Sequence, residues 1–193
     1  MDLILASTSV YRRRLLERLQ LPFRCIAPGT DESALADETP MQLAERLALA
    51  KAQAVAREHP QALVIGSDQV ASLQGDIMGK PGTAERAAAQ LQASAGNTVS
   101  FYTGVALVRA DSALQLSAVE RFDVRFRALT DIEIRRYVEL ESPLDCAGSF
   151  KVEGLGITLF ESLQGRDPTG LEGLPLIALS DLLRQAGHDP LSF

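Results

Sequence analysis

The chain has 193 residues, of which 46% are hydrophobic and 23% are charged, and its formal net charge is −6 at pH 7. This composition is typical of a globular protein and excludes disordered, collagen-like and coiled-coil classes, so we expect a single domain over residues 1–193. The acidic balance argues against a nucleic-acid partner. No apolar run is long enough to span a bilayer, and the N-terminus lacks the basic segment of a secretory signal. We therefore expect a cytoplasmic protein without membrane partners.

In the first third of the chain, short apolar runs alternate with segments of helical periodicity. Ser9 and Thr39 are residue types that commonly cap helix N-termini, and Pro40 suits the first position of a helix. The expected order is a strand at 3–6, a helix at 9–20, a strand at 23–29, an acidic loop at 30–33 and a helix at 39–58.

The rest of the chain continues this alternation. Residues 63–65 form an apolar run that suits a strand buried on both faces, and residues 130–133 form a capping box. We expect strands at 62–73, 99–108, 119–127 and 157–160, helices at 83–94, 130–138 and 175–185, and a turn or loop at 74–76, 77–82 and 164–170. Strands interleaved with helices predict an α/β fold with a mixed sheet flanked by helices.

The two cysteines, Cys25 and Cys146, lie far apart in the sequence and do not have the spacing of metal ligands. We expect buried free thiols rather than a disulfide or a zinc site.

Three consecutive arginines follow a run of hydroxyl residues at the expected start of the first helix. A helix N-terminus has unpaired N–H groups and favours anions over cations. Hydroxyl groups, helix N–H groups and the guanidinium groups of Arg12 and Arg13 would together form a phosphate site, whereas Arg14 is expected to be solvated. The residue types alone leave a second interpretation open, a solvated surface with an ordinary N-cap.

Carboxylates stand at two further positions of interest. Asp68 follows a buried strand, where ligands of open α/β sheets commonly bind, so it suits metal binding or general base catalysis; the alternative is a cap for the following turn. Asp31 and Glu32 in the acidic loop offer oxygen ligands for Mg²⁺ or Mn²⁺, although adjacent acids in a loop are usually just solvated.

Lysine is scarce in this chain, and most of the positive charge is on arginine. Two of the lysines, Lys80 and Lys151, lie in loops that contain glycine, and Lys51 lies at the edge of the apolar stripe of a helix. The glycines suggest a backbone that approaches a ligand closely, and an ordinary surface lysine is the alternative.

Taken together, these motifs resemble the Maf family of nucleoside triphosphate pyrophosphatases over nearly the whole chain. The resemblance is carried, in order, by ASTSVYRRRLL, DES, ALAKAQAVA, GSDQV, GKP, FYTGVALV and CAGSFKVEGLGITLFE. It implies an α/β fold like that of Maf proteins and inosine triphosphate pyrophosphatases, with two lobes around a cleft. It also implies a reaction in which a divalent cation, Mg²⁺ or Mn²⁺, and a general base direct water onto the α-phosphorus of a nucleoside triphosphate.

The resemblance assigns roles to individual residues. Asp68 matches the proton acceptor, and Glu32 and Asp68 match metal-binding positions, with Asp31 competing with Glu32 for the same role. The positions that match triphosphate-binding residues of the family are Ser7, Arg12, Arg13, Lys51 and Lys80.

The sequence is similar in particular to the YceF-type subgroup, which hydrolyses 7-methyl-GTP and so removes a modified nucleotide from the pool. The three positions that set base specificity in this subgroup are Tyr11, Gln69 and Glu153 here. An aromatic face and a carboxylate suit a methylated guanine, which is positively charged, although the subgroup has Trp at the position of Tyr11 and Tyr stacks more weakly.

Two other interpretations stay open. One is a pyrophosphatase for dTTP, UTP or other noncanonical nucleotides, and the other is a non-catalytic nucleotide-binding regulator of cell division. The sequence does not fix the oligomeric state, and a homodimer is compatible with it.

Overall fold

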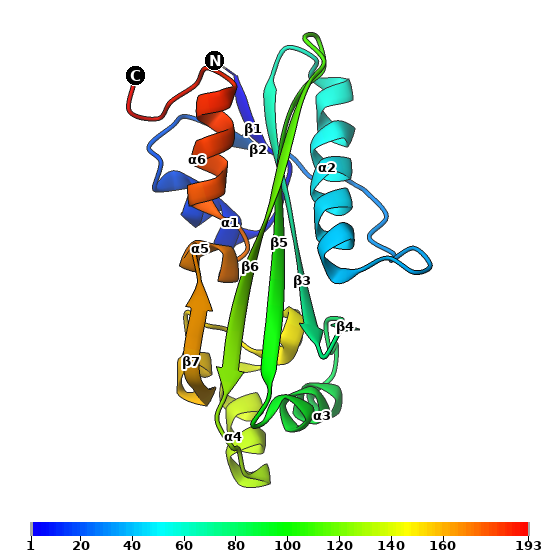
Figure 1. The fold of residues 1–193 in the computed structure, drawn as a ribbon, viewed down its shortest axis with the longest axis vertical. Coiled ribbons are helices and arrows are strands. Elements are labelled where there is room, and N and C mark those ends of the chain that lie inside the picture. Colours follow the sequence, from blue (N-terminus) through cyan, green and yellow to red (C-terminus); the bar gives the residue numbers. More distant parts are fainter. Residues whose placement is uncertain (1, 193) are drawn as a thin grey trace.

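The computed structural model describes residues 2–192, and a long twisted sheet runs through the length of the molecule (Figure 1). Its seven strands follow the order β2-β1-β3-β5-β6-β7, with β4 paired to β3. The strands are β1 (Leu3–Leu5), β2 (Arg24–Cys25), β3 (Leu63–Leu73), β4 (Asp76–Met78), β5 (Thr98–Arg109), β6 (Leu114–Phe126) and β7 (Phe160–Gly165). β1 pairs in parallel with β2 and β3, and the other pairs are antiparallel, so the sheet is mixed as expected.

Helices cover both faces of one end of the sheet and gather at its other end (Figure 1). They are α1 (Val10–Glu17), α2 (Pro40–Glu58), α3 (Ala84–Ser94), α4 (Asp131–Glu141), α5 (Pro168–Leu171) and α6 (Leu176–Gln185), with 3₁₀ helices η1 (Ala147–Ser149) and η2 (Leu155–Leu159). In Figure 1, α2 lies on one side of the long strands and α1 and α6 on the other, whereas α3 and α4 lie at the lower end. The long strands β3, β5 and β6 connect these two lobes.

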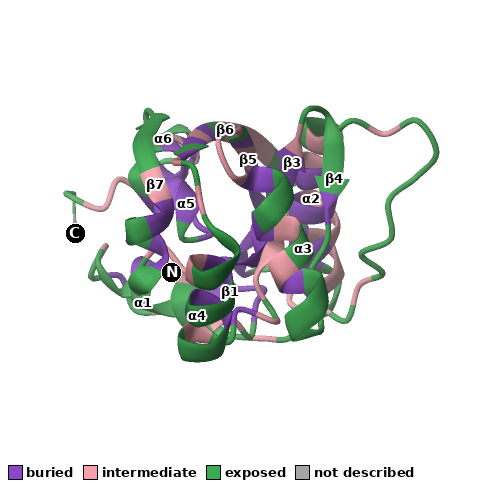
Figure 2. Cartoon of the chain, turned by 90° about the horizontal axis from the view of Figure 1, so that it is seen from below, coloured by how far each residue is buried: buried purple, intermediate pink, exposed green. Residues whose placement is uncertain are grey.

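Each lobe has its own apolar core. In one lobe, leucines of α1 and α6 pack on one face of the sheet and alanines of α2 pack on the other. In the second lobe, an aromatic core centred on Phe101, Phe126 and Phe150 packs with α3 and α4. Figure 2 shows the buried residues along the strands and on the inner sides of the helices, with exposed residues on the outer sides. The two cores explain the two lobes that the resemblance implied.

Two glycines let α2 lie directly on the sheet. A Cβ atom on Gly66 of β3 would be 2.1 Å from the carbonyl oxygen of Ala48, and one on Gly104 of β5 would be 2.3 Å from that of Ala44. Any side chain at these positions would therefore push α2 away from the sheet. The close approach brings the inner face of α2, which carries Lys51, next to the centre of β3.

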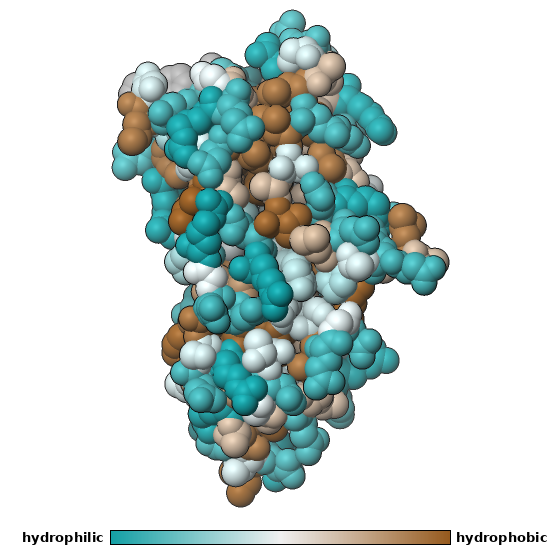
Figure 3. All heavy atoms as spheres, in the orientation of Figure 1, coloured by the Kyte–Doolittle hydropathy of each residue, from teal (hydrophilic) through white to brown (hydrophobic). Residues whose placement is uncertain are grey.

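The surface is mostly hydrophilic on the face drawn in Figure 3. Hydrophobic side chains form several small groups on this face. Between residues 2 and 192, no helix is long and apolar enough to cross a membrane.

Several local expectations from the sequence were wrong. Residues 76–78, expected as turn and loop, form β4, because Gln74 and Gly75 adopt positive φ angles of 55° and 99° and close a tight hairpin with β3. Residues 157–159 belong to η2 rather than to a strand, and β7 begins at Phe160 and continues into the segment that was expected to be a loop. That segment also contains α5, which Asp167 caps.

Other differences concern the edges of the sheet. The strand expected at 23–29 is reduced to Arg24–Cys25, and β6 begins at Leu114 rather than at residue 119. Both cysteines are free, as expected, but neither is buried: Cys25 is exposed on the short edge strand and Cys146 is half-buried.

Candidate active site

A cleft of about 1030 Å³ opens beside the centre of β3, between the two lobes. It is lined by residues from α1, α2 and β3, by the loop after β4 and by the segments around η1 and α5. All the site residues expected from the sequence except Arg13 line it, namely Ser7, Tyr11, Arg12, Glu32, Lys51, Asp68, Gln69, Lys80 and Glu153. These residues, spread over much of the chain, are thus brought to one place.

A buried ammonium group joins two carboxylates at the floor of the cleft. Lys51 of α2 is only 4% exposed, and its Nζ lies 2.6 Å from Oδ1 of Asp68 and 2.5 Å from Oε1 of Glu32. Burial raises the pKa of Glu32, but the hydrogen bond from Lys51 and the charges of Lys51, Lys80 and Arg12 outweigh it, so this pKa lies below its usual value. Glu32 is therefore held ionised in the cleft.

Asp31, the alternative to Glu32, has a different environment. Its Oδ1 accepts hydrogen bonds from the backbone N–H and the hydroxyl group of Ser33, at 2.9 and 2.7 Å, and these bonds lower its pKa. Asp31 is exposed and does not line the cleft. Of the two acids in this loop, Glu32 faces the other candidate residues.

The start of α1 forms a second wall of the cleft. Ser9 caps the helix by accepting a hydrogen bond from the backbone N–H of Arg12, at 3.4 Å, and the hydroxyl group of Ser7 accepts one from the backbone N–H of Ser9, at 3.1 Å. Nε of Arg12 donates to the carbonyl oxygen of Gly173, at 2.8 Å. Burial lowers the pKa of Arg12, while the nearby carboxylates Asp68 and Glu32 oppose this effect. Within residues 2–192 Arg12 forms no ion pair, so its charge is available to an anion in the cleft.

Of the next two arginines, Arg13 does not line the cleft as expected, whereas Arg14 is exposed, as expected. Arg13 points away from the cleft, with its side chain 63% exposed and its Nε 3.1 Å from Oε1 of Glu17, whereas the exposed Arg14 is part of the lining. Neighbouring residues on an α-helix point about 100° apart, so Arg12 and Arg13 cannot share one direction. Packing of Leu15 and Leu16 in the core fixes which way α1 faces.

The two lysines in glycine-containing loops also separate. Lys80 is exposed, lines the cleft and adds a positive charge near Glu32. Lys151 is not part of the lining; its Nζ donates to the carbonyl oxygen of Glu141 at the end of α4, at 2.9 Å. Lys151 therefore supports the second lobe.

The opposite end of the cleft is aromatic and acidic. Tyr11 is 37% exposed, and burial together with the charge of Glu153 raises its pKa. Glu172 and Asp145 also line the cleft. Burial and the charge of Glu153 raise the pKa of Glu172, against the opposing charge of Arg18. Neither Glu153 nor Glu172 forms an ion pair in the described part of the chain. The cleft is thus polarised, with Arg12, Lys51 and Lys80 around Glu32 and, near Tyr11, with carboxylates that form no ion pair among residues 2–192. Lys151 and Arg18 act on this acidic end from nearby and offset part of its negative charge.

Gln69 lies on β3 directly after Asp68, lines the cleft and contacts the protein through its amide nitrogen. Its Nε2 donates to the carbonyl oxygens of Gly170 and Leu171, at 2.8 and 3.0 Å, and lies 3.2 Å from Oγ1 of Thr103. The sequence did not reveal the contribution of residues 170–173 to the site, because their backbone carbonyl groups make these contacts and a carbonyl group is the same in every residue.

Two carboxylates of the cleft have the oxygen donors that a divalent cation requires. No group of three or more His, Cys, Asp or Glu side chains that could hold a metal ion occurs among residues 2–192. Magnesium usually binds to one or two carboxylates together with water and substrate phosphates rather than in an all-protein cage. Glu32 and Asp68, which contact the same ammonium group, provide such a pair.

Comparison with known proteins gives three kinds of match. The family described as Maf-like protein matches residues 2–186. A protein of Xanthomonas axonopodis pv. citri (strain 306), named 7-methyl-GTP pyrophosphatase, is 58% identical over 185 residues, which cover 96% of each chain. Among solved structures, a HAM1 protein from Coxiella burnetii has a TM-score of 0.51 at 16% identity and covers 96% of this chain and 99% of its own, which shows a shared fold. The Ham1 protein of Staphylococcus aureus has a TM-score of 0.49 at 14% identity, covering 81% of this chain and 90% of its own.

Proposed function

The chain belongs to the Maf family, and from this we propose that it is a nucleoside triphosphate pyrophosphatase that hydrolyses 7-methyl-GTP to 7-methyl-GMP and pyrophosphate. The relative at 58% identity carries the name of this activity. The observation that favours this substrate most is the polarity of the cleft. 7-Methyl-GTP has a cationic base and an anionic triphosphate, so its two ends have the charges that complement the two ends of the cleft.

We assign the triphosphate to the basic end. Arg12, Lys80 and the N–H groups at the start of α1 supply positive charge there, and Lys51 has a third N–H beyond the two that its carboxylate partners accept. Arg14 also lines the cleft, one turn of α1 after Tyr11. These groups stabilise the negative charge that develops on the departing pyrophosphate.

Asp68 is the proton acceptor in this proposal. Its Oδ1 accepts the hydrogen bond from Lys51, which fixes the orientation of the carboxylate beside the cleft. Water attacks the α-phosphorus, Asp68 takes its proton, and the bond from the α-phosphorus to the oxygen of the β-phosphate breaks. Glu32 and Asp68 would hold Mg²⁺ or Mn²⁺, which supplies neutralisation of the phosphate charge when bound.

We assign the base to the acidic end, where the ring of Tyr11 stacks on it and the carboxylate of Glu153 attracts its positive charge. The net charge of −6 supports action on free nucleotides rather than on nucleic acids. We propose that the protein works in the cytoplasm and removes a modified nucleotide from the pool.

The test is a product assay with purified protein. 7-Methyl-GTP is incubated with Mg²⁺ or Mn²⁺, and the products are separated by chromatography and identified by ³¹P NMR. We expect 7-methyl-GMP and pyrophosphate, with Asp68→Asn slower by roughly 10²- to 10⁴-fold, because general base catalysis contributes about that much. Asp189→Asn, far from the cleft, serves as the matched control and should retain activity.

Three outcomes would contradict the proposal. Release of inorganic phosphate would contradict attack at the α-phosphorus, and full activity of Asp68→Asn would remove Asp68 as the proton acceptor. Binding of nucleotides without turnover would instead support a regulatory module.

A further inference from the structure

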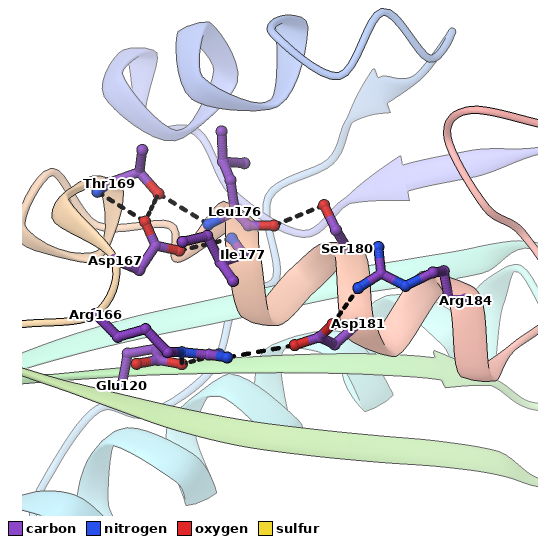
Figure 4. Close-up of polar contacts among 9 residues, drawn as sticks. All are labelled: Glu120, Arg166, Asp167, Thr169, Leu176, Ile177, Ser180, Asp181 and Arg184. Carbon is purple, nitrogen blue, oxygen red and sulfur yellow. Dashed lines mark hydrogen bonds and ion pairs between the residues drawn. The ribbon is translucent and has the colours of Figure 1, made fainter.

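The segment from Asp167 to Ile177, here called the strap, contains α5 and closes one side of the cleft. Hydrogen bonds fasten its two ends to each other (Figure 4). Asp167, only 2% exposed, accepts hydrogen bonds from the backbone N–H of Thr169 at 3.0 Å and from that of Ile177 at 2.6 Å. The hydroxyl group of Thr169 accepts a further one from the backbone N–H of Leu176 at 2.9 Å. The strap is therefore a closed loop with a defined shape.

The middle of the strap is fastened to the floor of the cleft. Gln69 and Thr103 donate to the carbonyl oxygen of Gly170, both at 2.8 Å, and Gln69 also donates to that of Leu171. The carbonyl oxygen of Gly173 accepts from the hydroxyl group of Ser67 at 2.9 Å and from Arg12. The carbonyl groups on both sides of residue 172 are thus fixed by side chains from β3, β5 and α1.

The two N–H donors of the Gln69 amide are used in these contacts. A side-chain amide has two donor hydrogens, and Nε2 of Gln69 has two strap carbonyl oxygens within 3.0 Å. Gln69 is a position that resemblance linked to base specificity, yet its amide nitrogen holds the strap. Through its amide nitrogen, Gln69 can therefore affect base choice by way of what the strap presents to the cleft.

The strap presents Glu172. It lines the cleft between two residues with fixed carbonyl groups, and it shares the cleft with Glu153, whose charge acts on it together with the opposing charge of Arg18. In the part of the chain that the structure describes, Glu172 has no ion-pair partner. An unpaired carboxylate held beside another one is stabilised by a cation that binds between or beside them.

We propose that Glu172 is a further specificity-determining residue, which recognises the positive charge of the base, and that Gln69 is a positioning residue that acts through the strap to hold Glu172 in place. The inference rests on the proposed function, because it takes the base to be cationic. A neutral guanine gains little from a second carboxylate, so the charge of Glu172 favours the methylated base over the unmethylated one.

The experiment is a double-mutant cycle on binding rather than on turnover. Dissociation constants for 7-methyl-GMP and GMP are measured by calorimetry for the wild type, Glu172→Gln, Gln69→Leu and the double variant. The ratio of the two dissociation constants reports recognition of the positively charged methylated base. An error from incorrectly folded protein affects both constants equally and cancels in the ratio. Glu58→Gln, an exposed acid on α2 away from the cleft, is the matched control.

We expect Glu172→Gln to reduce the preference for 7-methyl-GMP by roughly fivefold, the size of a partly exposed charge interaction, and to leave GMP binding unchanged. Gln69→Leu should reduce the preference similarly alone, but by less than about twofold in the Glu172→Gln background, because coupled residues are not additive. Thr103→Val, which removes another bond to Gly170, loosens the strap without altering Gln69 and should reduce the preference in the same direction.

An unchanged preference in Glu172→Gln would overturn the inference while leaving the proposed function intact. Fully multiplicative effects in the double variant would overturn the positioning role of Gln69. Equal binding of both nucleotides by the wild type would overturn the inference and the proposed substrate together.

Discussion

Replacing Lys51 by Met removes the ammonium group that contacts two carboxylates at the floor of the cleft. Nζ of Lys51 contacts Asp68 and Glu32 at 2.6 and 2.5 Å, and the lysine side chain is 5% exposed. Removing one partner of a buried ion pair costs about 3–5 kcal/mol, because a buried charge is left without compensation. Glu32 is 52% exposed and partly solvated, so we expect the lower end of this range, about 3 kcal/mol at pH 7.

The loss should depend on pH. The folded-state pKa of Glu32 lies below its usual value of 4.5, so its interaction with Lys51 stabilises the wild type above that value and is lost as the pH falls through the folded pKa. Lys51→Met lacks this interaction at every pH. The difference in stability between wild type and variant should therefore be full at pH 7 and should narrow below about pH 4.

Urea denaturation at pH 7 and at a series of pH values below 4 measures this difference as a shift of the midpoint at constant slope. Lys80→Met is the matched control, since Lys80 is exposed and forms no ion pair in the described residues; it should change stability by no more than about 0.5 kcal/mol. A loss below about 1 kcal/mol for Lys51→Met at pH 7, or a loss that does not narrow in acid, would refute the reasoning.

Two further predictions concern the wall and the base end of the cleft. Gly104→Ala should lower the free energy of unfolding by about 1–3 kcal/mol or more in thermal denaturation and should lower kcat/KM. Its Cβ would lie 2.3 Å from the carbonyl oxygen of Ala44 and push α2 with Lys51 away from Asp68. Unchanged activity would argue against this link, and the control Gly75→Ala, remote from α2, should lose stability but not activity. In steady-state kinetics, Tyr11→Ala should raise KM for 7-methyl-GTP more than it lowers kcat. Tyr11→Trp should lower KM, because the larger ring stacks more strongly on the base. An unchanged KM in both variants would show that Tyr11 is not part of the site.

Local chemistry made much of the fold predictable. Thr39 and Thr130 form capping boxes with the residues three positions later, and Ser9 caps α1, so the starts of these helices follow from short-range contacts. The strand β4 is too short, and too close to glycine and proline, to show a pattern of its own; only its pairing with β3 makes it a strand. The 3₁₀ helix η2 carries the apolar residues of a strand, yet among these only Leu159 is buried in the aromatic core, and Leu155 and Ile157 are exposed.

The site was predictable where side chains carry the chemistry and not where packing or the backbone does. Family motifs identified Asp68, Glu32 and Lys51, which the structure brings into contact. Which of the consecutive arginines faces the cleft depends on how Leu15 and Leu16 seat α1 in the core, which the sequence pattern does not specify. The strap is about a hundred residues from Gln69 in the sequence. Its contacts use backbone carbonyl groups, which are the same in every residue type and so give no sequence pattern.

The most direct test of the account is a competition assay in which 7-methyl-GTP, GTP, dTTP and UTP are present together with the purified protein and Mg²⁺. The initial rates of loss give the relative kcat/KM values for all four nucleotides under identical conditions. A polarised cleft with unpaired carboxylates at the base end predicts that 7-methyl-GTP is consumed fastest and that the wild type prefers it over GTP by roughly tenfold or more, the combined effect of two partly exposed charge interactions. Comparable or faster consumption of dTTP, UTP or GTP would contradict the assignment of the acidic end to a cationic base.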